Sequence, residues 1–322
     1  MCEMNFIPFQ TYTLRSHKYE VFMNYLITGG TGLIGQSVIA KLLQRHAFIT
    51  VLTRDISKAK KHLPRAVKFI ESLSLADIDH NDIVINLAGE SIADKRWSTA
   101  QKDKICASRW SLTQKIVSFI QASQSPPLLF ISGSAIGIYG RQRDQPIGEG
   151  FSHFNREFTN TLCEKWESIA MQASTESTRV SLLRTGLVLD KHQGALAKML
   201  LPFKLGIGGK IAQGDQIMSW IHIEDMTDAI IHIIHHDDLN GPINMTAENA
   251  VTNKVFSSTL AAKLRRPCLF STPASLLKLI FGEMADLLLF GQNVYPEKLL
   301  SSQFTFKHPT IDDALEDLLN TE

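Results

Sequence analysis

Four glycines near the start of the chain have the spacing of a phosphate-binding turn. Gly29, Gly30, Gly32 and Gly35 follow an apolar run and fit both G-x-G-x-x-G and G-x-x-G-x-x-G. Glycine allows a tight turn and a close approach to a pyrophosphate. The apolar residues of 33–44 recur at helical spacing, and the positive end of that helix should face the phosphate. A purely structural turn is the alternative, but this context favours a dinucleotide site. The expected cofactor-binding residues are Thr28, Gly29, Gly30, Thr31, Gly32, Leu33, Ile34 and Gly35.

Arg54 ends the next β-branched run, residues 48–53, about twenty positions after the glycines. A strand that selects NAD carries a carboxylate here for the ribose 2′-hydroxyl, whereas arginine can pair with a 2′-phosphate. A solvated surface arginine is the other interpretation. The position favours NADP as the cofactor, with NAD less favoured.

Two further strand ends carry small or polar residues. The segment 82–89 is an apolar strand that ends in a turn of Asn86, Leu87, Ala88 and Gly89, which should form a second part of the cofactor site. The run 128–134 ends at Ser134 and is followed by Tyr139. These hydroxyls could form hydrogen bonds to a substrate carbonyl or alcohol, or they could form hydrogen bonds to backbone groups in a turn.

Several cations and one amide are candidate substrate-binding residues: Lys95, Arg96, Arg184 and Gln216. Lys95 and Arg96 follow the 86–89 turn and could bind an anionic small molecule, or they could be solvated charges beside a packing tryptophan. His232, His235 and His236 end a helix, where polar residues interact well with free carbonyls, so we expect no metal site.

Strands and helices alternate along the first half of the chain, and these elements must position the glycines and hydroxyls. With 322 residues, 44% of them hydrophobic, the chain can bury a large core. A net charge of +1 indicates neither a nucleic-acid partner nor an anionic membrane, and no apolar run is long enough to span a bilayer. Four cysteines without paired spacing indicate a reducing compartment, so the cytoplasm is expected.

The sequence also resembles a known family along most of its length. TGGTGLIG, NLAG and SGSAIGIYG resemble the extended short-chain dehydrogenase/reductase superfamily. ESIADKRWS, LCEKWE, RTGLVLD, GDQIMSWIHIEDM and the tail beginning GEMADLLLFGQ look like its atypical branch, the epimerase family proteins or SulA-like NADP-dependent oxidoreductases. The resemblance implies an α/β fold with a Rossmann doubly wound parallel sheet that binds NAD(P).

The resemblance also implies a smaller C-terminal α/β portion that binds the substrate. We expect a disordered leader over 1–22, with Met23 as an alternative start, and a mainly Rossmann domain over 23–185. Residues 186–322 should be mainly substrate-binding, with some elements returning to the sheet. The apolar helical face between Leu276 and Leu288 should be core or interface, so a homodimer is possible.

One departure from the superfamily affects its chemistry. That chemistry rests on Tyr-x-x-x-Lys, but none of the five tyrosines here has lysine four residues later. Thr159 and Cys163 occupy the expected places, with Lys165 only nearby in sequence. Two function classes remain: an NADP-dependent oxidoreductase or epimerase with another proton donor, and a non-catalytic NADP-binding protein that acts through a partner or as a redox sensor. For the enzyme, the resemblance favours Ser134 and Tyr139 as catalytic groups.

Overall fold

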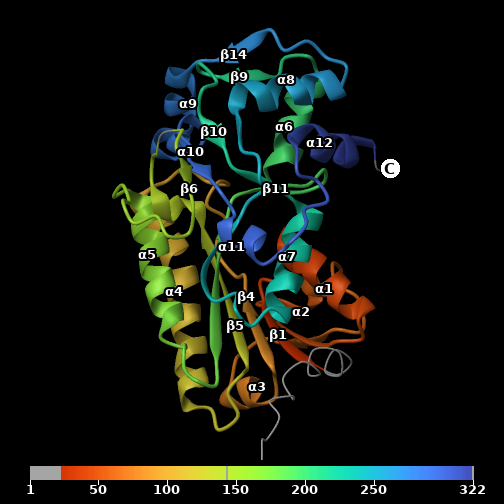
Figure 1. The fold of residues 1–322 in the computed structure, drawn as a ribbon, viewed down its shortest axis with the longest axis vertical. Coiled ribbons are helices and arrows are strands. Elements are labelled where there is room, and N and C mark those ends of the chain that lie inside the picture. Colours follow the sequence, from red (N-terminus) through yellow and green to blue (C-terminus); the bar gives the residue numbers. More distant parts are fainter. Residues whose placement is uncertain (1–22, 143, 321–322) are drawn as a thin grey trace, which may run out of the picture.

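The centre of the molecule is a parallel sheet of seven strands (Figure 1). The computed structural model describes residues 23–142 and 144–320, so the expected leader lies outside the described residues. In spatial order the strands are β12 (Gly241–Met245), β7 (Arg179–Thr185), β5 (Leu129–Ala135), β4 (Ile83–Asn86), β1 (Asn24–Thr28), β2 (Phe48–Leu52) and β3 (Lys68–Ile70). Every neighbouring pair is parallel, and the strand order reverses between β1 and β4. This arrangement confirms the doubly wound α/β prediction.

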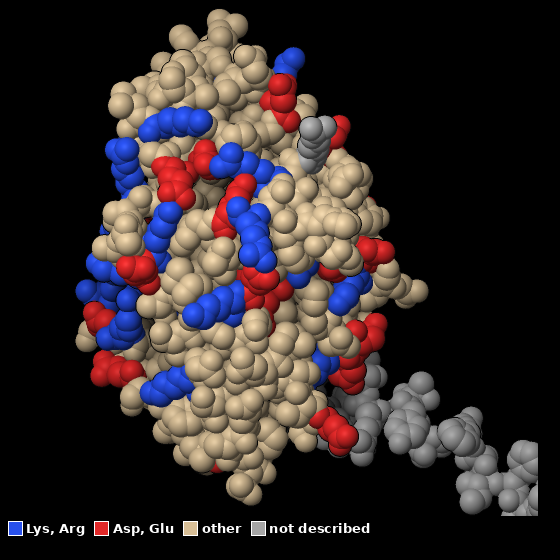
Figure 2. All heavy atoms as spheres, turned by 90° about the vertical axis from the view of Figure 1, so that its left-hand side faces the viewer, with Lys and Arg blue, Asp and Glu red and all other residues tan. Residues whose placement is uncertain are grey.

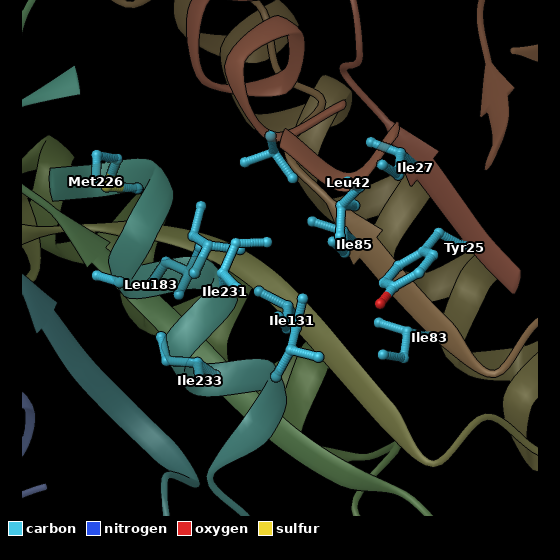
Figure 3. Close-up of a cluster of buried hydrophobic side chains, with 14 of the residues drawn as sticks. Tyr25, Ile27, Leu42, Ile83, Ile85, Ile131, Leu183, Met226, Ile231 and Ile233 are labelled. Atoms are coloured by element: carbon cyan, nitrogen blue, oxygen red, sulfur yellow. The ribbon is translucent and has the colours of Figure 1, made fainter. Parts of the chain in front are cut away.

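Helices cover both faces of the sheet, which explains why its central strands β4, β5 and β7 are buried along nearly their whole length. One face carries α1 (Leu33–Gln44) and α7 (Ile223–His235), and the other carries α3 (Leu75–Asp79), α4 (Thr99–Ala122) and α5 (Phe158–Met171). Figure 3 shows Ile85, Ile131 and Leu183 of the sheet among side chains of α1 and α7. Burial of these apolar side chains stabilises the sheet. Because its strands are parallel, their carboxyl ends lie at one edge.

A second group of elements lies beyond that edge, and we call it the cap. It contains α6 (Gly194–Lys204), α8 (Asn253–Lys263), α9 (Ala274–Phe281) and α12 (Ile311–Asn320). Its strands form short pairs: β8 (Leu187–Leu189) with β11 (Trp220–His222), β9 (Gly209–Ile211) with β14 (Phe270–Thr272), and β10 (Ile217–Met218) with β13 (Val251–Thr252). Trp220, Phe256 and Leu315 are central to its separate core.

The remaining short elements connect the cap to the sheet. β15 (Asn293–Val294) pairs with β6 (Pro146–Ile147), which follows β5 and the 3-10 turn η1 (Ile136–Tyr139). The other short helices are α2 (Ile56–Ala59), η2 (Gly282–Ala285), α10 (Asp286–Leu289) and α11 (Glu297–Ser301). On α9, Leu276, Leu279 and Ile280 are exposed, so this part of the apolar stripe is not core. A dimer through it stays a prediction.

The surface gives two further facts about partners. None of the described helices combines the length and apolar character needed to cross a bilayer. Figure 2 shows the side of the molecule that bears α4 and α5, where basic and acidic side chains are interspersed. This face therefore presents no continuous basic stripe.

Candidate functional site

The glycine turn between β1 and α1 is built from contacts that exclude side chains. Gly29 has φ +70°, and a Cβ there would lie 2.5 Å from the carbonyl carbon of Leu87. A Cβ on Gly35 would lie 2.4 Å from the carbonyl oxygen of Gly29, so helix and turn touch through backbone. Gly32 is the N-cap of α1, and no side chain caps this end. The first N–H groups of the helix therefore remain available to an anion.

The side chains of Thr28 and Asn86 connect the two strands at the reversal of strand order. Oγ1 of Thr28 donates to Oδ1 of Asn86 (2.6 Å), and Nδ2 of Asn86 donates to Oγ1 of Thr113 on α4 (2.9 Å). The backbone N–H of Ala88 donates to Thr28 Oγ1 (3.3 Å). Both side chains are buried, so they fix the positions of the 29–35 and 87–89 turns relative to each other.

Arg54 lies just beyond the carboxyl end of β2, the strand next to β1. Its side chain is exposed, and within the described ranges the structure records no ion pair for it. Asp55 beside it accepts the backbone N–H of Lys58 and caps α2. Arg54 is therefore free to pair with an anionic group at this corner of the sheet.

A buried polar network joins α5, η1, β5, β7 and β12. Glu167 accepts hydrogen bonds from Oγ of Ser134 (2.6 Å) and from Nε and Nη2 of Arg184 (both 2.9 Å). Nη1 of Arg184 donates to the hydroxyl of Tyr139 (3.0 Å), which donates to Oδ1 of Asn244 (2.7 Å). None of the five side chains belongs to a residue more than 8% exposed. The network is therefore closed to solvent.

This geometry bears on three of the expected site residues. Tyr139 is 0% exposed, and burial raises the pKa of its hydroxyl despite the opposing charge of Arg184. Burial also opposes the charge of Arg184, but the carboxylate of Glu167 holds the pKa of that guanidinium above its usual value. Ser134, Tyr139 and Arg184 bind one another through internal partners, which favours a structural role over contact with a substrate.

The sequence analysis missed Glu167 and Asn244 as partners in this network. A signal for Glu167 was present, because it lies four residues after Cys163 and three before Ala170, both buried on α5. A charged residue at a core position of an amphipathic helix requires a partner. Asn244 has no comparable signal, because an amide in a strand gives no indication of which distant element it faces.

The places expected for the tyrosine and lysine pair are occupied by small buried side chains. Thr159 and Cys163 are 9% and 2% exposed. Burial, with the nearby charge of Glu167, raises the pKa of Cys163 to about 12. Lys165 lies over the ring of Trp110, with Nζ 4.2 Å from its centroid. Lys165 therefore does not supply the missing cation.

The other candidate substrate residues lie on the loops between the sheet and the cap. Lys95 is exposed, with Nζ 3.6 Å from a carboxylate oxygen of Glu90. Arg96 reaches the carbonyl oxygen of Leu279 on α9, at 3.4 Å. Gln216 donates to the carbonyl oxygen of Leu288 at 2.9 Å, so it connects the residue before β10 to α10. Of the four predicted substrate residues, Lys95 and Arg96 are exposed, whereas Gln216 is partly buried and Arg184 is buried.

Arg109 on α4 was also missed, and it approaches the 87–89 turn directly. A Cβ on Gly89 would lie 2.8 Å from Cζ of Arg109, and Nη1 of Arg109 donates to the carbonyl oxygen of Glu90 (2.9 Å). The signal was its spacing, because Arg109 follows the buried Ile105 by four residues and precedes the buried Ile116 by seven. An arginine on this inward stripe should have been considered as a site residue.

One group of potential metal ligands occurs within the described ranges, formed by His222, His308 and Asp317. Nδ1 of His222 accepts the backbone N–H of Glu224 and caps α7, so the proton of the neutral ring lies on Nε2. That nitrogen lies 3.3 Å from Oδ2 of Asp317. Burial lowers the pKa of His222 to about 4, which favours the neutral ring. A ring nitrogen that carries a proton offers no lone pair to a metal, so this arrangement supports a joint between β11, α7 and α12.

Comparisons with known proteins agree with this architecture. Residues 25–245 match the family model described as the NAD dependent epimerase/dehydratase family, and residues 272–318 match a domain of unknown function, DUF1731. An epimerase family protein of Staphylococcus saprophyticus is 36% identical over 297 residues, covering 92% of this chain and 99% of the relative.

Two solved structures extend the comparison to three dimensions. The human epimerase family protein SDR39U1 (isoform 2), solved with NADPH, is 28% identical with a TM-score of 0.83, and the match covers 93% of this chain and 100% of that one. A nucleoside-diphosphate sugar epimerase of Corynebacterium glutamicum is 26% identical with a TM-score of 0.74, covering 92% and 58%. These matches confirm the resemblance inferred from the sequence motifs. The chain belongs to the NAD dependent epimerase/dehydratase family and carries that family's fold with a DUF1731 segment at its C-terminal end.

Proposed function

We propose that the protein is an NADP-dependent oxidoreductase or epimerase that acts on a small-molecule substrate without the usual Tyr-x-x-x-Lys pair. The observation that carries this proposal is the combination of the side-chain-free turn at Gly29 and Gly35 with the unpaired, exposed Arg54 at the end of β2. In a doubly wound sheet the dinucleotide crosses the point where strand order reverses, and the residue ending β2 meets the adenosine ribose. The SDR39U1 structure with NADPH supports the same choice of cofactor.

Each part of the chain has a role in this function. The N–H groups at the start of α1 bind the pyrophosphate, and Arg54 binds the 2′-phosphate. The bound nicotinamide would supply or accept a hydride. Thr28 and Asn86 hold the two turns in register through their mutual hydrogen bond of 2.6 Å. The cap lies over the carboxyl edge of the sheet and excludes water from the substrate. One structural neighbour is a nucleoside-diphosphate sugar epimerase. Sugar nucleotides, which are anionic small molecules, are therefore the first class of substrate to test.

A second candidate is a non-catalytic NADP-binding protein that acts through a partner or as a redox sensor. The closed network around Glu167 favours it, because Ser134 and Tyr139 are both turned inward. NADPH oxidation across a panel of carbonyl compounds and sugar nucleotides separates the two functions. Bound NADPH that is never oxidised, together with a protein partner that co-purifies, would reject the enzyme.

Replacement of Arg54 by alanine tests the choice of cofactor. A charge-assisted hydrogen bond contributes about 1.5–3 kcal/mol, so NADPH affinity should fall roughly tenfold to a hundredfold, while NADH affinity stays the same. Calorimetric titration of both cofactors measures this difference. The matched control is Arg45→Ala, because Arg45 is an exposed arginine at the opposite end of α1 from the glycine turn. Equal losses for NADPH and NADH would contradict the assignment of Arg54 to the 2′-phosphate.

A further inference from the structure

Arg109 projects from α4 against the turn that follows β4. Its Cζ would be 2.8 Å from a Cβ on Gly89, so only glycine lets the guanidinium approach this closely. Nη1 donates to the carbonyl oxygens of Glu90 (2.9 Å) and Ile105 (3.2 Å). The guanidinium also lies over the ring of Trp166, with Cζ 5.3 Å from its centroid. These contacts fix the group in one place beneath the 87–89 turn.

The structure records no ion pair for Arg109 in the described part of the chain, and the charge of Glu90 acts on it only from a longer distance. No carboxylate there lies within ion-pair distance, and the carboxylate of Glu90 is instead 3.6 Å from Nζ of Lys95. The recorded hydrogen bonds use Nη1 alone, which leaves the N–H groups of Nε and Nη2 for other acceptors. Burial lowers the pKa of Arg109, which reflects the cost of holding a cation here. A partly buried cation without a counter-ion is typical of a site that receives an external oxygen ligand.

The residue at position 163 carries no positive charge that would repel Arg109. Cys163 on α5 lies within electrostatic range of the Arg109 guanidinium. Position 163 is where a lysine was expected from the Tyr-x-x-x-Lys pattern, and a cationic side chain there would place a second positive charge within electrostatic range of Arg109. The chain thus carries a cation at this edge of the sheet from α4 in place of one from α5.

The strand order indicates which half of a dinucleotide this cation meets. Arg54 follows β2 on one side of the glycine turn, whereas Gly89 follows β4 on the other side, in the order β2, β1, β4, β5. A dinucleotide with its 2′-phosphate at Arg54 and its pyrophosphate at the turn extends its nicotinamide half over β4 and β5.

We propose that Arg109 binds the nicotinamide half of the dinucleotide, with the N–H groups of Nε and Nη2 donating to its ribose hydroxyls. This inference rests on the proposed function, because it requires a dinucleotide in the site. It makes Arg109 a cofactor-binding residue that stands in for the absent lysine. Arg54 and Arg109 then hold opposite ends of one ligand.

Two ligands that share the adenosine half test this assignment. NADPH contains the nicotinamide riboside, whereas adenosine 2′,5′-bisphosphate lacks it and keeps the 2′-phosphate. Arg109→Met should weaken NADPH binding by about tenfold or more and leave the bisphosphate unchanged. Arg54→Ala should weaken both ligands. Calorimetric titration gives all four affinities without any need for a substrate.

Two further variants separate binding from folding. Arg109→Lys retains the charge, so its ratio of NADPH to bisphosphate affinity should lie between those of the wild type and Arg109→Met, even if the methionine variant folds poorly. Arg179→Met is the matched control, because Arg179 is a partly buried arginine at the start of β7 that donates to the carbonyl oxygens of Leu239 (2.6 Å) and Ile233 (3.0 Å) and lies 3.7 Å from a carboxylate oxygen of Asp237. It should leave the ratio unchanged.

Three outcomes would overturn the proposal. Equal weakening of both ligands in Arg109→Met would show that Arg109 only supports the turn. Unchanged NADPH affinity would show that the guanidinium does not reach the ligand. Wild-type protein that binds neither ligand would reject the proposed function as well, whereas tight wild-type binding with either of the first two results rejects Arg109 alone.

Discussion

The buried Arg184 and the partly buried Arg109 both approach the carboxyl edge of the sheet, and their surroundings differ in one respect. Arg184 on β7 is paired bidentately with Glu167 at 2.9 Å and also donates to the hydroxyl of Tyr139. Arg109 on α4 donates only to two carbonyl oxygens and has no carboxylate within ion-pair distance among the residues described. Both charges are largely removed from water, but only the first is neutralised by the protein.

This difference separates a structural charge from one that can serve a ligand. An ion pair inside the protein gains little from a substrate, because its charge is already neutralised by its partner. A fixed cation with unused N–H groups gains hydrogen bonds and charge neutralisation when a ligand enters. Proximity to the strand ends is therefore a weaker guide to function than the state of a residue's hydrogen bonds.

The largest effect should follow from removal of the negative charge in the closed network. Glu167→Gln leaves Arg184 buried without a counter-ion and directs an amide group toward existing donors. Such a loss costs about 3–5 kcal/mol of unfolding free energy. Urea denaturation followed by circular dichroism measures it.

The matched control for this variant is an exposed ion pair. Glu157 lies 2.8 Å from Nε of Arg141, and their side chains are 26% and 43% exposed. Glu157→Gln should cost about 1 kcal/mol or less, because water already solvates both groups. Similar losses in the two variants would mean that water reaches Arg184 and that the contrast with Arg109 is not one of neutralisation.

A smaller effect should follow from loss of the Tyr139 hydroxyl. Tyr139→Phe leaves Oδ1 of Asn244 and one N–H of Arg184 without a partner, at a cost of about 1–3 kcal/mol in stability. NADPH affinity and any rate of NADPH oxidation should stay at the wild-type level, because the hydroxyl is hydrogen-bonded to Asn244 and Arg184 inside the protein. If oxidation stopped while stability was unchanged, Tyr139 would be the proton donor and the network would have to open during turnover.

The sequence predicted the parallel sheet and the glycine-rich turn between its first strand and helix, because these depend on local signals; the binding of a cofactor at that turn stays a prediction. The helix expected at 33–44 is α1, Leu33–Gln44, because glycines and apolar periodicity act within a few residues. The roles of Ser134 and Arg184 were harder to judge, because their partner Glu167 lies 33 and 17 residues away. Sequence spacing identifies residues that are capable of chemistry. Only tertiary packing decides whether their polar atoms are already hydrogen-bonded to other residues of the protein.

The smallest expected effect is on the reactivity of the Cys163 thiol. It shows whether the positive charge of Arg109 acts on this thiol or on a bound ligand. A cation can activate a cysteine by lowering its pKa, but burial and the nearby Glu167 raise the pKa of Cys163 to about 12. Below that pH the thiol stays protonated, so iodoacetamide at pH 8 should label the partly exposed Cys268 and leave Cys163 unmodified in peptide mass spectra.

Arg109→Met should leave this pattern unchanged, since burial controls the thiol more strongly than the guanidinium does. Rapid alkylation of Cys163 that depended on Arg109 would mean that the cation is matched to a thiolate within the protein. Arg109 would then resemble Arg184, a charge neutralised internally, and its N–H groups would no longer be free for the cofactor. An inert Cys163, combined with a selective loss of NADPH affinity in Arg109→Met, leaves the ligand as the group that neutralises this charge.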